Sequence, residues 1–188
     1  MFWLLLGLVV FHGLHSLRML APNWRQARIT QMGEDKWKGL FSLLSIASVA
    51  LIVWGYSIVR ATEEVVYVPF AWGASANIIL MFFVFCLIPF NLRSNRLSKI
   101  TKHPFAIAML LWSVGHLLAN GDLASVILFG SFLVWVVFYL ALVRKREDTP
   151  NPHAPLWQDI GAVLFSLAIY VFFICKAHAW LFGVSPIG

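Results

Sequence analysis

The stretch from Leu123 to Val143 reads LASVILFGSFLVWVVFYLALV and contains no charged residue. A helix of about 20 apolar residues is long enough to span the hydrocarbon core of a bilayer. Three basic residues, Arg144, Lys145 and Arg146, follow this stretch directly. Because loops rich in Lys and Arg usually stay on the cytoplasmic side, the stretch predicts a transmembrane helix whose C-terminal end faces the cytoplasm.

The composition extends this interpretation to the whole chain. Of its 188 residues, 61% are hydrophobic and 12% are charged, and the mean hydropathy is +0.82. Soluble domains carry about 25% charged residues, so this balance excludes a water-soluble globular enzyme. The formal net charge is +6, but the basic residues are dispersed among short loops and form no single basic face. We therefore expect the lipid bilayer as a partner and no nucleic acid.

Apolar blocks of about one bilayer crossing each recur along the chain. The fourth is the shortest, and together they cover residues 2–20, 40–59, 70–92, 104–119, 123–143 and 157–182. They predict an all-α fold, a polytopic bundle of six transmembrane helices. We expect this bundle to form a single integral-membrane domain over residues 1–188.

The loops between these blocks alternate in charge. The second loop has Arg60 opposed by Glu63 and Glu64, and the fourth has no Lys or Arg. The odd loops are basic, so the positive-inside rule places them in the cytoplasm and both termini in the periplasm. Their basic residues are Arg18, Arg25, Arg28, Lys36 and Lys38 in the first loop, Arg93, Arg96, Lys99 and Lys102 in the third, and Arg144, Lys145 and Arg146 in the fifth.

Ionisable residues at membrane depth are costly and indicate functional sites. His12 and His15 lie in the first block, and His116 lies in the fourth. No block has a carboxylate at its centre, which argues against a proton relay built on Asp or Glu. Near the outer end of the sixth block, Lys176 and His178 are expected to act as anchors at the membrane interface.

Imidazoles from two helices are suitable ligands for a haem iron inside a helical bundle. His116 can therefore pair with His12 or with His15. Arg18, one turn beyond His15, can neutralise a haem propionate. At about 1.5 Å of rise per residue, His12 comes closer than His15 to the depth of His116. The alternative is that the histidines only hydrogen-bond to neighbouring helices.

Three further polar residues lie at predicted helix ends. His103 precedes Pro104, a position that suits an N-cap or first-turn residue. Asn120, Gly121 and Asp122 form a turn between the fourth and fifth blocks, and the Asp122 carboxylate can cap the helix that follows. We expect His103, Asn120 and Asp122 to support helix ends or iron ligands without contacting the iron.

Several of these segments resemble the NnrU family of bacterial membrane proteins. The resemblance covers about residues 4–143. Its strongest part is the histidine followed by Asn-Gly-Asp at the end of the fourth block. The segments that carry it are HSLR (15–18), WKGLFSL (37–43), WG (54–55), KHP (102–104) and HLLANGDLA (116–124).

The resemblance implies a protein of the bacterial inner membrane associated with denitrification, where the family is linked to nitrite and nitric oxide reduction. The family is also related to the zeta-carotene isomerases of plastids and cyanobacteria, which are haem b proteins. By this resemblance His116 is one haem ligand, and His15, or His12 in its place, is the other. The isomerases carry a cysteine three residues before the matching histidine. This chain has Ser113 there, which argues against isomerase chemistry.

Three functions are compatible with the sequence. The first is a haem b-binding accessory, sensing or redox component of nitrite and nitric oxide metabolism, with nitric oxide and a membrane redox protein as partners. The second is a haem-dependent membrane isomerase that acts on a hydrophobic polyene. The third is a haem-free membrane scaffold or small transporter. A haem spectrum distinguishes the first two from the third, and turnover of a carotenoid distinguishes the first from the second.

Overall fold

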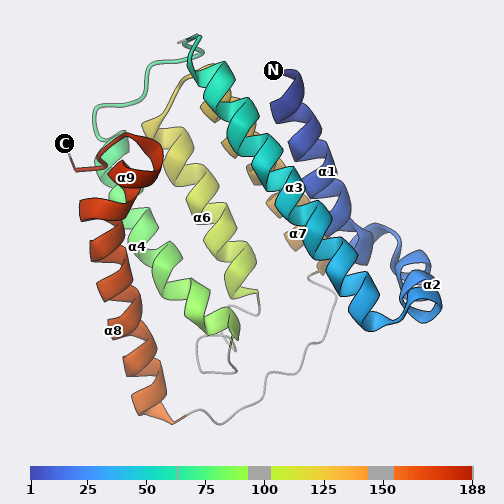
Figure 1. The fold of residues 1–188 in the computed structure, drawn as a ribbon. Coiled ribbons are helices and arrows are strands. Elements are labelled where there is room, and N and C mark those ends of the chain that lie inside the picture. The colour runs from blue at the N-terminus through green and yellow to red at the C-terminus, as the bar shows by residue number, and fades with distance from the viewer. Residues whose placement is uncertain (63, 93–102, 144–154, 188) are drawn as a thin grey trace. The chain divides into compact units, whose positions relative to one another are not determined.

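The computed structural model describes residues 1–62, 64–92, 103–143 and 155–187 (Figure 1). Within these ranges the chain is helical apart from its connections and one isolated bridge between Val65 and Asp122. The predicted all-α fold is confirmed. The helices in chain order are α1 (Phe2–Leu20), α2 (Pro22–Met32), α3 (Glu34–Arg60), α4 (Gly73–Leu92), α6 (Pro104–Ala119), α7 (Leu123–Val143), α8 (Leu156–Phe172), the π-helical turn η1 (Phe173–Ala177) and α9 (His178–Phe182).

The helices match the predicted blocks, with differences at some ends. The bounds of α1, α6 and α7 are those predicted. Helix α3 begins at Glu34 and not at residue 40, because the chain leaves the preceding helix at Gly33, where φ is +84°. Helix α4 begins at Gly73 and not at residue 70, because the Gly73 N–H closes a turn onto the Phe70 carbonyl at 2.8 Å. Helix α2 was not predicted from the apolar blocks; it begins with Pro22 at a position that favours proline.

The chain divides into two compact units. Unit 1 comprises Met1–Val68 and Gly121–Arg144, and unit 2 comprises Pro69–Asn120 and Lys145–Gly188. Unit 1 therefore contains α1, α2, α3 and α7, and unit 2 contains α4, α6, α8, η1 and α9. Neither unit is a continuous segment of the chain. The single integral-membrane domain over residues 1–188 stays a prediction.

In unit 1, α1 and α3 pack against each other as an antiparallel pair (Figure 1). Each helix presents a glycine to the other. A β-carbon on Gly7 would lie 2.9 Å from the Ser48 carbonyl oxygen, and one on Gly55 would overlap the backbone of Leu4. Small residues of this kind let two helix backbones approach closely, which is how helices commonly associate in lipid.

Helix α7 joins this pair through polar side chains. The Tyr56 hydroxyl lies 3.0 Å from the Ser125 hydroxyl, and the Trp135 indole N–H donates to the Ser16 hydroxyl at 2.8 Å. Ser16 and Ser125 are buried. An apolar interior offers these hydroxyl and indole groups few other hydrogen-bond partners. The two bonds therefore fix which side of α7 faces α1 and α3.

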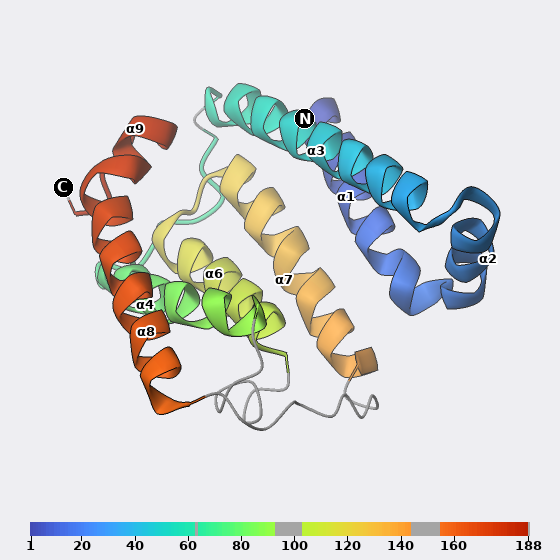
Figure 2. The same cartoon turned by 60° about the horizontal axis from the view of Figure 1, so that its bottom comes forward.

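In unit 2, α6 lies beside α4 (Figures 1 and 2). The carbonyl of Leu118 occupies the space where a β-carbon on Gly73 would lie, so the start of α4 meets the end of α6. Helix α8 packs on α4 through the Tyr170 hydroxyl, which donates to the Ile78 carbonyl at 2.7 Å. The Phe85 ring lies 5.6 Å from the Tyr170 ring. These contacts hold α4, α6 and α8 in one body.

The helices expose many apolar side chains, as expected of helices that contact lipid. In the described part of the chain, four helices are long and apolar enough to cross a membrane, and α6 and the described part of α4 are shorter apolar helices. Large side chains point outward, among them Val9, Ile46, Val134 and Leu164, which are 61–72% exposed. In water such a surface would promote aggregation. The basic residues of the predicted third and fifth loops lie outside the described residues.

Candidate functional site

His15 is held by its own helix. Its Nδ1 lies 2.8 Å from the Phe11 carbonyl oxygen, one turn earlier in α1. A carbonyl oxygen can only accept, so Nδ1 carries the ring proton and Nε2 keeps its lone pair in the neutral imidazole. The ring also stacks on Phe11, with centroids 4.0 Å apart, and meets the Phe41 ring edge to face at 5.2 Å. His15 therefore presents an oriented nitrogen of the kind that ligates iron.

His116 has the same arrangement in α6. Its Nδ1 donates to the Trp112 carbonyl, again four residues earlier, at 2.9 Å. The Trp112 ring lies 5.3 Å from the imidazole. Here too the proton is on Nδ1 and the lone pair is on Nε2. Metal-ligating histidines typically donate their second ring N–H to a carbonyl or carboxylate in this way.

His12 differs from both in the position of its ring proton. Its Nε2 lies 3.3 Å from the Ser131 hydroxyl of α7. That hydroxyl donates its single hydrogen to the Leu128 carbonyl at 2.8 Å, so it must accept from His12, and Nε2 carries the proton. The Nδ1 of His12 is buried without a hydrogen-bond partner. The Phe132 ring covers one side of the imidazole at 4.6 Å.

The structure brings some of the predicted site residues together. His12, His15 and Arg18 lie on α1 in unit 1, and His116 lies in unit 2. Arg18 is exposed in the last turn of α1, three residues after His15 and on the same side of the helix. The pairing of His116 with a histidine of α1 stays a prediction. Among the described residues, no three His, Cys, Asp or Glu side chains converge on one point as a metal cluster requires.

Comparison with known proteins supplies the identity. The family model described as NnrU protein matches residues 3–186, nearly the whole chain. The chain belongs to the NnrU family. No curated protein and no solved structure matches it. The match extends the relationship beyond residues 4–143 to the last helix, where the sequence analysis found no motif.

The Asn-Gly-Asp motif of this NnrU protein connects α6 to α7. The Asp122 carboxylate accepts from the Ser125 N–H at 2.9 Å and so caps the start of α7. Asn120 donates to the His116 carbonyl through its side-chain amide at 3.0 Å. The Gly121 carbonyl accepts from the Val66 N–H at 2.8 Å. The motif thus ends one helix, starts the next and attaches the segment that follows α3.

His103 of the NnrU chain stands at the N-cap position of α6, as the sequence suggests, and its side chain does not make the capping bond. Its carbonyl accepts from the Ile107 N–H at 3.0 Å, the first bond of the helix. His103 thus begins α6 through its backbone carbonyl.

Two features of the NnrU protein were missed by sequence reasoning. Ser131 decides which nitrogen of His12 carries the proton, although it lies 119 residues away in the sequence. His178, read as an interface anchor, has its Nδ1 2.7 Å from the Val184 carbonyl oxygen. No pattern of apolar residues signals either contact, because both depend on how the chain folds back. A serine within an apolar helix was the only available hint of the first.

Proposed function

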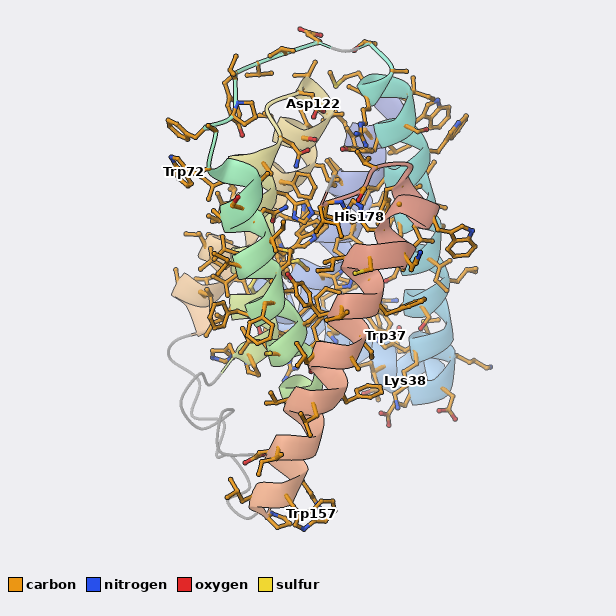
Figure 3. All side chains as sticks on the ribbon, turned by 90° about the vertical axis from the view of Figure 1, so that its left-hand side faces the viewer. Trp37, Lys38, Trp72, Asp122, Trp157 and His178 are labelled. Atoms are coloured by element: carbon orange, nitrogen blue, oxygen red, sulfur yellow. The ribbon has the colours of Figure 1, made fainter. Side chains whose placement is uncertain are left out.

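We propose that this NnrU protein crosses the bacterial inner membrane six times, with both termini in the periplasm. Four long apolar helices and two shorter ones support the number of crossings. The 16 residues of α6 span about 24 Å at 1.5 Å each, somewhat less than the hydrocarbon core, and local thinning or the flanking residues can make up the difference. The orientation follows from the basic odd loops. Trp72 and Trp157 lie at opposite ends of unit 2, as expected of residues at the two interfaces (Figure 3).

Within this membrane protein we propose a haem b site in which His116 and His15 would hold the iron. The observation that supports it is the matched pair of imidazoles. In each, Nδ1 donates to the carbonyl four residues earlier, which leaves Nε2 unprotonated and oriented. Neutral nitrogen ligands suit a low-dielectric interior because they add no charge there. The donor set therefore fits a haem iron.

His15 is the better candidate of the two α1 histidines. His12 would have to break its bond to Ser131 and lose the proton from Nε2 before that nitrogen could bind iron. His15 needs no such change. By its depth in the sequence His12 is nearer to His116, but tilt of α1 or α6 can change relative depth by several ångströms. The position of the ring proton follows instead from hydrogen bonding. Arg18, on the same side of α1, is the proposed partner of a propionate.

We assign the site to nitrite and nitric oxide metabolism as an accessory, sensing or redox component. A bound haem would supply an iron that can exchange an electron or bind a diatomic ligand. The residues of this chain orient the two imidazoles that would bind the iron. Phe11 and Phe41 restrict the His15 ring, and the Trp112 carbonyl holds the His116 ring. Nitric oxide and a membrane redox protein remain the proposed partners.

The site gives no support to isomerase chemistry. At the position of the isomerase cysteine, Ser113 is fully buried and its hydroxyl donates to the Met109 carbonyl at 2.9 Å. A serine hydroxyl engaged in this way offers no alternative soft ligand to an iron. We therefore do not propose turnover of a polyene. Incubation of the purified protein with zeta-carotene is expected to leave the carotenoid unchanged, and isomerisation would favour the enzyme over our proposal.

The deciding experiment is a reduced-minus-oxidised absorption spectrum of protein purified in detergent from haem-replete cells. Asparagine is the matched replacement, because its amide nitrogen occupies the place of Nδ1 and can still donate to the carbonyl while Nε2 is lost. His116→Asn should abolish the haem bands. His15→Asn should reduce the haem content several-fold, and His12→Asn should leave it unchanged.

Each alternative has its own result. A colourless wild-type protein with a normal helical circular dichroism spectrum would overturn the haem proposal and favour a scaffold or transporter. Loss of haem in His12→Asn with full retention in His15→Asn would reverse the assignment of the α1 ligand.

A further inference from the structure

Helix α2 is longer than the connection between α1 and α3 requires. Packed antiparallel helices are commonly joined by about 2–8 residues, whereas residues 21–33 separate α1 from α3, and Pro22–Met32 within them are helical. The helix begins with a proline and ends at Gly33, whose φ of +84° favours glycine. The chain thus forms a defined helix where a short turn would be enough.

Helix α2 lies beside the ends of α1 and α3 that it connects (Figures 1 and 2). Its Ile29 and Met32 side chains are half-buried, and the helix packs on both neighbours. Helix α3 has 27 residues, more than the roughly 20 that cross the hydrocarbon core. Because Glu34, Asp35 and Lys38 all lie in its first turns, this end of α3 extends beyond the core. Helix α2 therefore lies at the level of the lipid headgroups.

The charge on α2 is of one sign. Its 11 residues include Arg25 and Arg28 and contain no Asp or Glu. Among the described residues, the one salt bridge pairs Lys38 with Glu34 at 2.9 Å, both in α3. No carboxylate in this part of the chain thus forms an ion pair with either arginine. A helix with only positive charge at the membrane surface is complementary to an anionic surface.

Arg28 is oriented in a way that suits a phosphate. Its guanidinium lies over the Trp24 ring, 5.6 Å from the ring centroid. Stacking occupies one face of this planar group and leaves the N–H donors at its edge available. Arg25, three residues earlier, lies on the same side of the helix. The Trp24 ring meets the Trp37 ring edge to face at 6.1 Å, and tryptophans are enriched at the level of the headgroups.

We propose that α2 binds the headgroups of anionic phospholipids, with Arg25 and Arg28 contacting the lipid phosphate. The guanidinium fork matches the geometry of a phosphate, and each arginine near an anionic membrane surface adds to the attraction. In the orientation proposed above, this surface belongs to the cytoplasmic leaflet. The inference requires α1 and α3 to cross the membrane, and it does not depend on the haem site.

The test measures lipid binding to the full chain in detergent by native mass spectrometry. Phosphatidylglycerol and phosphatidylcholine are added together, because both have a phosphate but only the first has a net negative charge. The wild type should bind phosphatidylglycerol in preference. Arg25→Gln/Arg28→Gln should reduce this preference by about fivefold for each arginine. Arg28→Lys, which keeps the charge and loses the planar fork, should reduce it less than Arg28→Gln does.

Arg60→Gln is the matched control. Arg60 also lies over an aromatic ring, that of Tyr56 at 6.0 Å, but at the opposite end of α3. This variant should keep the lipid preference of the wild type. An equal loss in the control would show that the net charge of the protein, and not α2, attracts the lipid. Equal binding of the two lipids by the wild type, or a preference that persists in the double variant, would also overturn the inference.

The haem function is measured separately. The double variant should keep the haem bands and the helical circular dichroism of the wild type, because neither arginine is a proposed haem-binding residue. A colourless wild-type protein that still prefers phosphatidylglycerol would overturn the haem function and leave the lipid-binding role of α2 standing.

Discussion

The carbonyl of His116 accepts two hydrogen bonds from Asn120, one from the backbone N–H at 2.8 Å and one from the side-chain amide at 3.0 Å. Asn120 thereby ends α6 one turn after the candidate ligand and fixes the backbone from which the imidazole projects. A helix leaves its last carbonyls without partners inside the helix, and polar residues just beyond it commonly satisfy them. Asn120 therefore helps to position His116, the proposed iron ligand.

Asn120→Ala should destabilise the protein by removing the side-chain bond while keeping the backbone bond. A typical hydrogen bond contributes about 1 kcal/mol, so a small fall in Tm is expected in detergent, followed by tryptophan fluorescence. Asn23→Ala is the matched control, since Asn23 is exposed on α2. An equal fall in both variants would remove any special role for Asn120.

Gly7→Ala should destabilise unit 1, because the added methyl group would press on the backbone of Ser48 and Ile52. Overpacking of this kind costs about 1–3 kcal/mol. Gly13→Ala, in the same helix, meets open space and should leave stability unchanged or raise it slightly. Thermal unfolding of the two variants beside the wild type tests the close approach of α1 and α3. Equal stability of the two would contradict it.

Asp122→Ala should lower stability by about 1 kcal/mol through loss of the N-cap of α7. Asp122→Asn keeps an acceptor oxygen for the Ser125 N–H and should be close to wild type. Asp122→Ala loses both the capping oxygen and the negative charge, whereas Asp122→Asn loses only the charge. Chemical or thermal unfolding of the two variants therefore separates the effect of capping from that of charge. Equal losses would mean that the charge, and not the cap, is what stabilises this end.

The same asparagine variant should change the titration of a tyrosine outside the membrane-spanning helices. Burial raises the pKa of Tyr67, and the negative charge of Asp122 raises it further, because both disfavour the phenolate. Asp122→Asn removes the second cause only, so the pKa of Tyr67 should fall but stay above its ordinary value. Ultraviolet titration of the phenolates measures this. Asp35→Asn, at the far end of α3, is the control and should leave the Tyr67 titration unchanged.

The positions of the helices could be predicted from the sequence because lipid as a solvent demands long apolar segments that satisfy their own backbone. Pro22 and Gly33 mark the ends of α2 in the sequence, but its 11 residues have no apolar stripe that would predict a helix. The π-helical turn could not be foreseen, since it depends on packing such as that of Phe173 on Phe85 at 5.3 Å.

The candidate site was only partly predictable. The residue types at positions 12, 15 and 116 indicate imidazole chemistry, and their place in apolar blocks indicates membrane depth. Which nitrogen carries each proton depends on partners that folding supplies. For His15 and His116 that partner is a carbonyl of the same helix, and for His12 it is Ser131 on another helix. The contact between His12 and Ser131 cannot be predicted from the sequence because the two residues are 119 positions apart.

The interleaved order of the two units has a consequence for how the protein is made. As the ribosome delivers the chain from the N-terminus, α1 and α3 are synthesised before α4 and α6, yet unit 1 is incomplete until α7 arrives. Until then His12, Ser16 and Tyr56 lack the α7 partners that satisfy them. A chain that stalls before Leu123 would leave these polar groups without their α7 partners, which is costly in an apolar environment and makes the incomplete chain prone to misassembly.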